Sequence, residues 1–146
     1  MVRKGCCMNA ILYARVSTDD QSERGTIEGQ IEFGQKYAEL HQMSLVKIYK
    51  DDGISGTYEL KDRNGGNELL NDVTSGHVKA NILLVYKLDR LGRSARVILN
   101  SIYELEQHGI KVKSMTEEFD SSSPSGRFLL TMLAAVADLE RETIIE

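Results

Sequence analysis

Two short segments carry side chains that could act together on a phosphate ester. The first, Tyr13-Ala14-Arg15-Val16-Ser17-Thr18, is typical of a short apolar strand that ends in a hydroxyl. Side chains on a strand alternate between its faces, so Arg15 and Ser17 are expected to point the same way. A guanidinium donates paired hydrogen bonds to phosphate oxygens, and a serine oxygen can attack phosphorus. We therefore predict that Ser17 is a nucleophile and Arg15 a phosphate ligand.

The second segment, Lys87-Leu88-Asp89-Arg90-Leu91-Gly92-Arg93, adds two arginines and a carboxylate. Arg90 and Arg93 are three residues apart, so they share a face if this turn is helical. Preset positive charge stabilises the phosphate oxygens during phosphoryl transfer. Asp89 could handle a proton or anchor the arginines, and the sequence leaves both roles open. The three histidines lie outside both segments, which argues against a Ser-His-Asp triad.

Strands and helices are expected to alternate along the chain and to position these side chains. Apolar runs predict strands at residues 10–17, 45–49, 82–86 and 110–115. Helical spacing predicts helices after Thr26, near residues 69–73, after Ser94 and from residue 127 onward. This alternation indicates an α/β fold of three layers, with a mostly parallel central sheet of four to five strands flanked by helices. The carboxyl ends of parallel strands meet at one edge, where the two segments would converge.

Two stretches of the sequence are predicted as irregular connections. Residues 51–67 are polar and suggest a long mobile loop. Asp51 and Asp52 at its start could hold a metal, but two loop acids alone are usually solvated. Residues 121–126 contain serines, a proline and a glycine, which predict a break before the final helix. That helical pattern shows no stop signal before Glu146, so we expect the chain to be a fragment that ends inside a long helix.

The composition limits the classes of protein to consider. With 146 residues, one domain is expected, and a formal net charge of -4 argues against a free-standing nucleic-acid binder. No apolar run approaches the length of a membrane span. The two cysteines are adjacent, Cys6 and Cys7, which does not suit a disulfide framework. We therefore expect a reduced cytoplasmic protein with no membrane partner.

The two segments together resemble the catalytic domain of the serine site-specific recombinases. This family includes resolvases, invertases, phage integrases and transposon recombinases, and the resemblance extends from Asn9 to the end of the chain. It implies a nucleophilic serine, phosphate-binding arginines, a neighbouring aspartate and two glutamines. The matching residues are Ser17, Arg15, Arg90, Arg93, Asp89, Gln21 and Gln30.

The resemblance also implies DNA contacts outside the two segments. Arg63 matches a basic residue of the loop after the second strand, although the proline that follows it in integrase-type members is missing here. Arg141, next to Glu140, matches an acidic and basic pair on the long final helix. Residues 23–30 are more similar to large serine recombinases than to small resolvases, which favours the branch with a large DNA-binding region.

For this family, the implied activity is the cutting and rejoining of DNA through a covalent 5'-phosphoserine. Neither a metal nor ATP is expected, and the implied partners are DNA and further copies of the chain, as dimers and as tetramers on DNA. The implied organisation is an irregular tail at 1–8, a catalytic domain at 9–126 and the start of an oligomerisation helix at 127–146. The DNA-binding region would be absent from this chain.

Two other interpretations compete with a recombinase. The chain could be a non-catalytic oligomerisation module that keeps the fold but has lost the chemistry. It could also be a serine-based phosphoesterase that acts on soluble substrates. The intact Ser17 and arginines argue against the first, and the missing water-activating base argues against the second.

Overall fold

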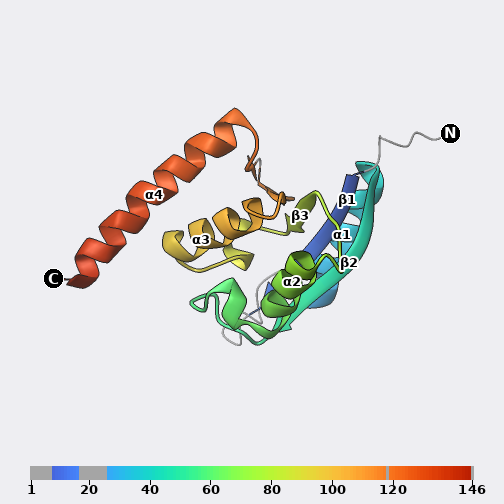
Figure 1. The fold of residues 1–146 in the computed structure, drawn as a ribbon, viewed down its shortest axis with the longest axis horizontal. Helices are drawn as coiled ribbons and strands as arrows, with labels where there is room; N and C mark the ends of the chain where they lie inside the picture. The colour runs from blue at the N-terminus through green and yellow to red at the C-terminus, as the bar shows by residue number, and fades with distance from the viewer. Residues whose placement is uncertain (1–7, 17–25, 118, 146) are drawn as a thin grey trace.

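The computed structural model describes residues 8–16, 26–117 and 119–145, with side chains described as far as residue 139. Its centre is one five-stranded sheet with the strand order β2-β1-β3-β4-β5 (Figure 1). The strands are β1 (Met8–Val16), β2 (Met43–Asp52), β3 (Ile82–Val85), β4 (Lys111–Ser114) and β5 (Phe119–Asp120). The first four strands are parallel, and β5 pairs antiparallel with β4. The predicted α/β fold with a mostly parallel sheet is therefore confirmed.

Helices cover both faces of this sheet. They are α1 (Ile27–Leu40), α2 (Asn64–Ser75), α3 (Ala95–Glu106) and α4 (Pro124–Ile145), with short 3-10 turns η3 (Leu60–Asp62) and η4 (Leu88–Arg90). Alternate residues of β1 enter different cores, because a strand presents successive side chains to opposite faces. Ala10 and Leu12 pack in the core under α1, whereas Ile11 and Tyr13 pack in the larger core under α2 and α3. The molecule thus has the three layers that the sequence predicts.

The helix ends follow the local sequence signals. Thr26 Oγ1 accepts a hydrogen bond from Gly29 N at 3.1 Å, and Ser94 caps α3 through Val97 N. Gly76 ends α2 with a φ of 81°, a left-handed conformation that glycine adopts without strain. The two helix starts after Thr26 and Ser94 were predicted from the same residues and are confirmed.

The polar stretch 51–67 is more ordered than the sequence predicts. β2 extends to Asp52, the turn η3 follows, and α2 begins already at Asn64. The prediction of one long loop was wrong because Asp51 holds the start of α2: its carboxylate accepts from Gly65 N at 2.6 Å and from Gly66 N at 3.1 Å. A side chain on Gly65 would overlap the carbonyl oxygen of Lys50, so only glycine lets the helix approach the strand this closely.

The predicted break at residues 121–126 is also partly wrong. β5 precedes it, and α4 begins at Pro124, a position where the missing proline N–H costs nothing. Ser123 Oγ accepts from Gly126 N at 3.0 Å and caps the helix. The two-residue strand β5 was not predicted, because its pairing with β4 is a long-range contact with no periodic sequence signal.

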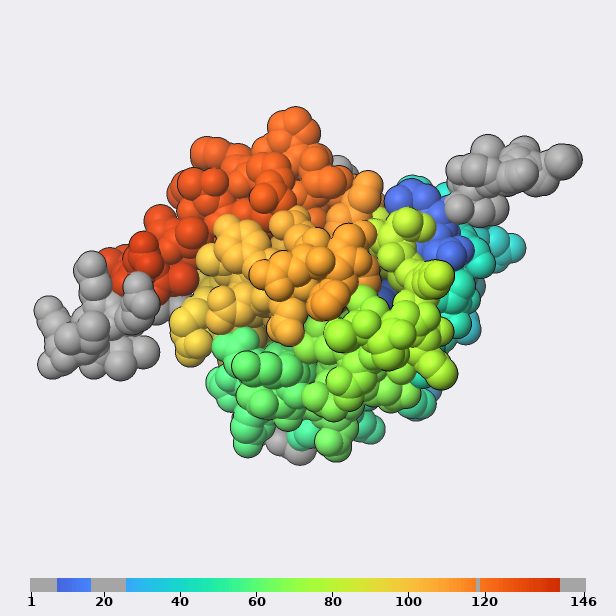
Figure 2. Space-filling model, viewed as in Figure 1, coloured from blue at the N-terminus to red at the C-terminus, as the bar shows by residue number. Residues whose placement is uncertain are grey.

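The final helix lies along α3, on the side of the molecule away from β1 and β2 (Figures 1 and 2). Leu130 turns inward and is buried in the larger core. Four large apolar side chains at helical spacing face outward instead: Phe128, Met132, Val136 and Leu139. Within the described part of the chain, no helix is long and apolar enough to cross a membrane.

Candidate active site

The predicted site residues that the structure describes gather where β1 and β3 end. Val16 is the last described residue of β1, and its carbonyl accepts from Gly53 N at 2.7 Å and from Ile54 N at 3.1 Å. These bonds hold the loop of residues 53–57 against the end of the strand. Ser17 and Gln21 lie outside the described residues, so the structure places only the residue to which Ser17 is attached.

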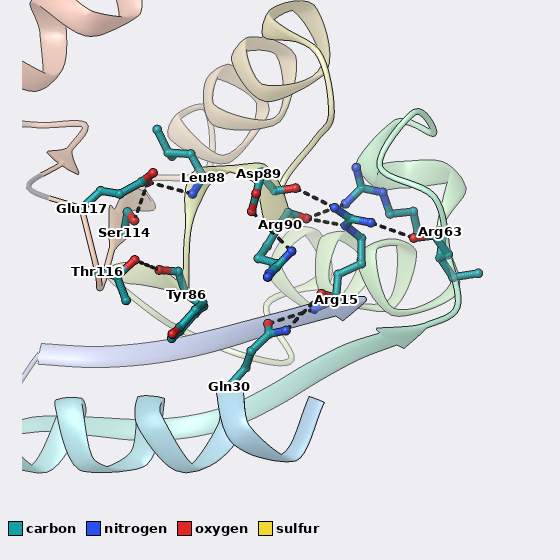
Figure 3. Close-up of polar contacts among 11 residues, drawn as sticks. Arg15, Gln30, Arg63, Tyr86, Leu88, Asp89, Arg90, Ser114, Thr116 and Glu117 are labelled. Atoms are coloured by element: carbon teal, nitrogen blue, oxygen red, sulfur yellow. Dashed lines mark hydrogen bonds and ion pairs between the residues drawn. The ribbon is translucent and has the colours of Figure 1, made fainter. Parts of the chain in front are cut away.

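Arg15 is buried, with 2% of its surface exposed, and its guanidinium is tied to backbone carbonyls (Figure 3). Its Nε donates to Arg90 O at 2.9 Å, and Nη2 donates to Asp89 O at 2.6 Å. Its Nη1 donates to Ile54 O at 2.8 Å. Burial, followed by the positive charge of Arg63, lowers the pKa of Arg15 below its usual value. Arg15 thus connects the end of β1 to the turn η4 and to the loop after β2.

Gln30, on the inner face of α1, holds the backbone of the same arginine. Its Oε1 accepts from Arg15 N at 3.2 Å, and its Nε2 donates to Arg15 O at 3.1 Å. Its side chain is fully buried. The structure therefore brings Gln30 to the site, where it fixes the strand from which Ser17 follows.

Arg63 comes to the same turn from the start of α2. It is 1% exposed, and its Nη1 donates to Arg90 O and to the hydroxyl of Tyr13, both at 3.2 Å. Its Nη2 donates to the carbonyls of Leu91 and Tyr58, and its Nε also donates to Tyr58 O. All five N–H donors of this guanidinium therefore have an acceptor. The predicted DNA contact of Arg63 remains a prediction, and it requires some of these bonds to open.

Tyr13 and Asp51 complete the buried polar cluster. The Tyr13 hydroxyl donates to Asp51 Oδ2 at 2.7 Å, and both residues are buried. Burial raises the pKa of Tyr13, against a lowering by Arg63, so the phenol stays protonated and remains a donor. The expectation that Asp51 is solvated was wrong, because this carboxylate accepts from a phenol and from two backbone amides at the start of α2.

Arg90 and Asp89 lie on η4 at the centre of the site. Arg90 is 3% exposed, and its Nη1 lies 3.4 Å from Asp89 Oδ1, whose side chain is 61% exposed. Arg90 Nε is a buried side-chain nitrogen for which no acceptor exists among the described residues. A buried donor without a partner is rare in folded proteins. A phosphate oxygen would fit the charge of this group.

Arg93 follows η4 and presents an exposed side chain, while its backbone is held from the loop after β2. Its N–H donates to Gly56 O at 2.9 Å. A Cβ atom on Gly56 would lie 2.9 Å from Arg15 Nη2 and 3.1 Å from Arg93 N, closer than ordinary contacts. Gly56 therefore allows Arg15 and Arg93 to approach the same loop. Residues 91–94 are not helical, so Arg90 and Arg93 do not share a helix face. An irregular turn connects them instead.

Three buried arginines and the exposed Arg93 thus gather around η4 and the loop after β2, next to the end of β1. The family model for the resolvase N-terminal domain matches residues 10–146 of this chain. The chain belongs to this family. It is 37% identical over 139 residues to the serine recombinase gin of Escherichia phage Mu, which covers 92% of this chain and 61% of that protein. The chain therefore spans about three fifths of the length of this relative.

Solved structures of resolvase-family proteins resemble this domain closely. The N-terminal catalytic domain of TP901-1 integrase matches with a TM-score of 0.78 and 36% identity, covering 92% of this chain and 98% of that one. A resolvase family site-specific recombinase from Streptococcus pneumoniae matches with a TM-score of 0.79 and 29% identity, covering 94% and 90%. The resemblance inferred from two sequence segments is confirmed for the family, whereas the branch with a large DNA-binding region stays a prediction.

Several contributors to this resolvase-family site were missed or left unplaced. Tyr13 and Asp51 were not predicted as site residues, although Tyr13 shares the strand face of Arg15, whose register partner on β2 is Asp51. That period-two spacing was the signal that could have found Tyr13. Arg141 belongs to α4, but its side chain and that of Glu140 lie outside the described part, so their predicted role is untested.

Proposed function

We propose that this domain cuts and rejoins DNA by transferring a phosphodiester to Ser17. The observation that carries the proposal is that Gln30, Arg90 and Arg93 gather around Arg15, at the strand end that leads directly into Ser17. The Ser17 oxygen attacks the phosphorus, the bond to the 3' oxygen breaks, and that oxygen takes a proton. A 5'-phosphoserine remains, and attack by a 3' hydroxyl reverses the step. A phosphoester bond to Ser17 replaces the broken bond to the 3' oxygen, so the bond energy is conserved. The reaction therefore needs no ATP, and we expect no metal.

The arginines are assigned distinct parts in this reaction. Arg90 and Arg93 bind the phosphate, because one has an unused buried donor and the other an exposed guanidinium. Arg15 links the nucleophile strand to η4 through its bonds to the carbonyls of Asp89 and Arg90. Its own contact with phosphate would need one of these donors to change partner. Asp89 holds Arg90 through their 3.4 Å ion pair.

The partners in this proposal are DNA and further copies of the chain, in a dimer and, on DNA, a tetramer. The exposed apolar stripe on α4 supports self-association, since an apolar patch of this kind usually marks an interface. Phe128, its largest member, is 66% exposed. We place the reaction in the cytoplasm, and we assign sequence-specific DNA binding to a region outside this chain.

Covalent capture of DNA tests the proposal. The full-length protein that contains this chain is incubated with a plasmid library of random sequence and then denatured. We expect a protein–DNA adduct that survives detergent, and sequencing of the captured ends identifies the site. Ser17→Ala should abolish the adduct, whereas Ser44→Ala, at an exposed serine of β2, should leave it unchanged.

Three results would contradict the proposal. An adduct that persists at full level in Ser17→Ala would place the covalent bond on another residue. A wild-type protein that binds and assembles on the plasmids without an adduct would instead support the non-catalytic module. Hydrolysis of p-nitrophenyl phosphate that is lost in Ser17→Ala, without an adduct, would support the phosphoesterase.

A further inference from the structure

Glu117 lies in the connection from β4 to β5, outside both segments that carry the predicted chemistry. Its Oε1 accepts from Leu88 N at 3.0 Å and from the hydroxyl of Ser114 at 2.9 Å. Leu88 is the first residue of η4, the turn that carries Asp89 and Arg90. From the connection after β4, the carboxylate therefore contacts the amide that begins η4, which follows β3 (Figure 3).

The segment from Tyr86 to Leu91 is held from two sides. On one side, Arg15 and Arg63 donate to the carbonyls of its last three residues. On the other side, Thr116 Oγ1 donates to Tyr86 O at 2.7 Å, and Glu117 accepts from Leu88 N. The arginines hold carbonyls, whereas Glu117 holds the first amide of the turn. The two sets of bonds thus fix both ends of the same short segment.

We propose that Glu117 is a positioning residue of the recombination site, which sets the orientation of η4 and through it the guanidinium of Arg90. This inference rests on the proposed function. Within η4, Arg90 N donates to Lys87 O at 3.0 Å, and Leu91 N donates to Leu88 O at 2.9 Å. The turn has only these two internal bonds, so its orientation depends on the groups that hold its ends. A small displacement of a catalytic group is enough to lower a rate strongly.

The exposed position of Glu117 separates positioning from global stability. The side chain is on the surface, so its removal opens no cavity in the core, but it leaves the hydroxyl of Ser114, which is 1% exposed, without this acceptor. Ser114 orients the accepting oxygen, because its hydroxyl donates to the same Oε1 atom as Leu88 N. An amide oxygen can accept the same two bonds, so glutamine should replace glutamate here while alanine should not.

The first measurement follows the turn itself. Hydrogen exchange of the Leu88 amide is compared by NMR in this chain and in Glu117→Ala, Glu117→Gln and Glu39→Ala. Glu39 is an exposed acid on α1 and serves as the charge-matched control. We expect exchange at Leu88 to be about tenfold faster in Glu117→Ala. In Glu117→Gln and Glu39→Ala it should stay close to wild type.

The second measurement follows the chemistry in the full-length protein. At saturating DNA, adduct formation should be about tenfold slower in Glu117→Ala, with DNA affinity unchanged and only a small fall in melting temperature from the unpaired Ser114 hydroxyl. Glu117→Gln should restore the rate to near wild type. A role in stability alone would lower the melting temperature instead, and a role of the negative charge would leave Glu117→Gln as slow as Glu117→Ala.

The outcomes separate this inference from the proposed function. Wild-type rates in Glu117→Ala, or wild-type exchange at Leu88, would overturn the positioning role while the recombinase assignment stands. Equal loss in Glu117→Gln and Glu117→Ala would also overturn it. An absence of adduct in the wild-type protein would overturn the proposed function and, with it, any catalytic role for Glu117.

Discussion

Two groups of the same chemical kind lie on neighbouring strands of this domain, and their charged members differ in depth. Tyr13 on β1 donates to Asp51 and accepts from Arg63, and all three side chains are buried. Tyr49 on β2 donates to Asp72 on α2 at 2.8 Å, and Asp72 pairs with Lys47 at 2.7 Å near the surface. We call these the inner and the outer group.

The comparison shows what burial requires of a cation. Arg63 is surrounded by carbonyls, and its planar fork of five donors matches five acceptor contacts. Lys47 carries a compact ammonium that water also reaches, and it contacts Asp72 and Glu68. Arg63 also donates to carbonyls at η4, and Asp51 also accepts from the first amides of α2. The inner group is therefore part of the site's frame, whereas the outer group attaches α2 to the edge strand β2.

The largest expected difference is between the two cations. Arg63→Met should lower the free energy of unfolding by about 3–5 kcal/mol, because it removes all five hydrogen bonds and leaves buried carbonyls and the Tyr13 hydroxyl unpaired. Lys47→Met should have a far smaller effect, since water replaces the ammonium. Urea unfolding followed by circular dichroism measures both. Similar losses in the two variants would contradict the contrast between inner and outer groups.

The carboxylates provide the second comparison. Asp51→Asn keeps the shape of the side chain but removes its charge, so the charge-assisted bonds from Tyr13 and from the first amides of α2 weaken or are lost. We expect a loss of about 2 kcal/mol in the free energy of unfolding. Asp72→Asn should cost less than about 1 kcal/mol, as is typical of pairs at the surface. Equal losses of unfolding free energy in Asp51→Asn and Asp72→Asn, measured by urea unfolding, would show that burial does not determine the cost of removing the charge.

The same contrast explains how far the sequence could predict the site. Arg15 and Arg90 were found because strand periodicity and a short basic segment are local patterns. Asp51 was interpreted as solvated because its partners, the amides at the start of α2, become visible only when the helix packs on the sheet. Glu117 gave no signal, since its bond to Leu88 N spans 29 residues. Local patterns thus predicted the cations, but not the acceptors that hold them.

The smallest expected effect is a pH dependence of stability that comes from the outer group. Hydrogen bonds from Lys47 and then from Tyr49 lower the pKa of Asp72. The stabilisation from this carboxylate is therefore present above its unfolded-state pKa of about 3.9 and is lost as the pH falls through the lower folded-state value. Urea unfolding of both proteins is measured at pH 5 and at pH 3. Between these two pH values, the free energy of unfolding should fall slightly more in the wild type than in Asp72→Asn, which has no carboxylate to protonate at this position. Identical pH dependence in the two proteins would mean that the Lys47–Asp72 pair adds nothing to stability in solution, although both atoms of the pair lie 2.7 Å apart in the structure.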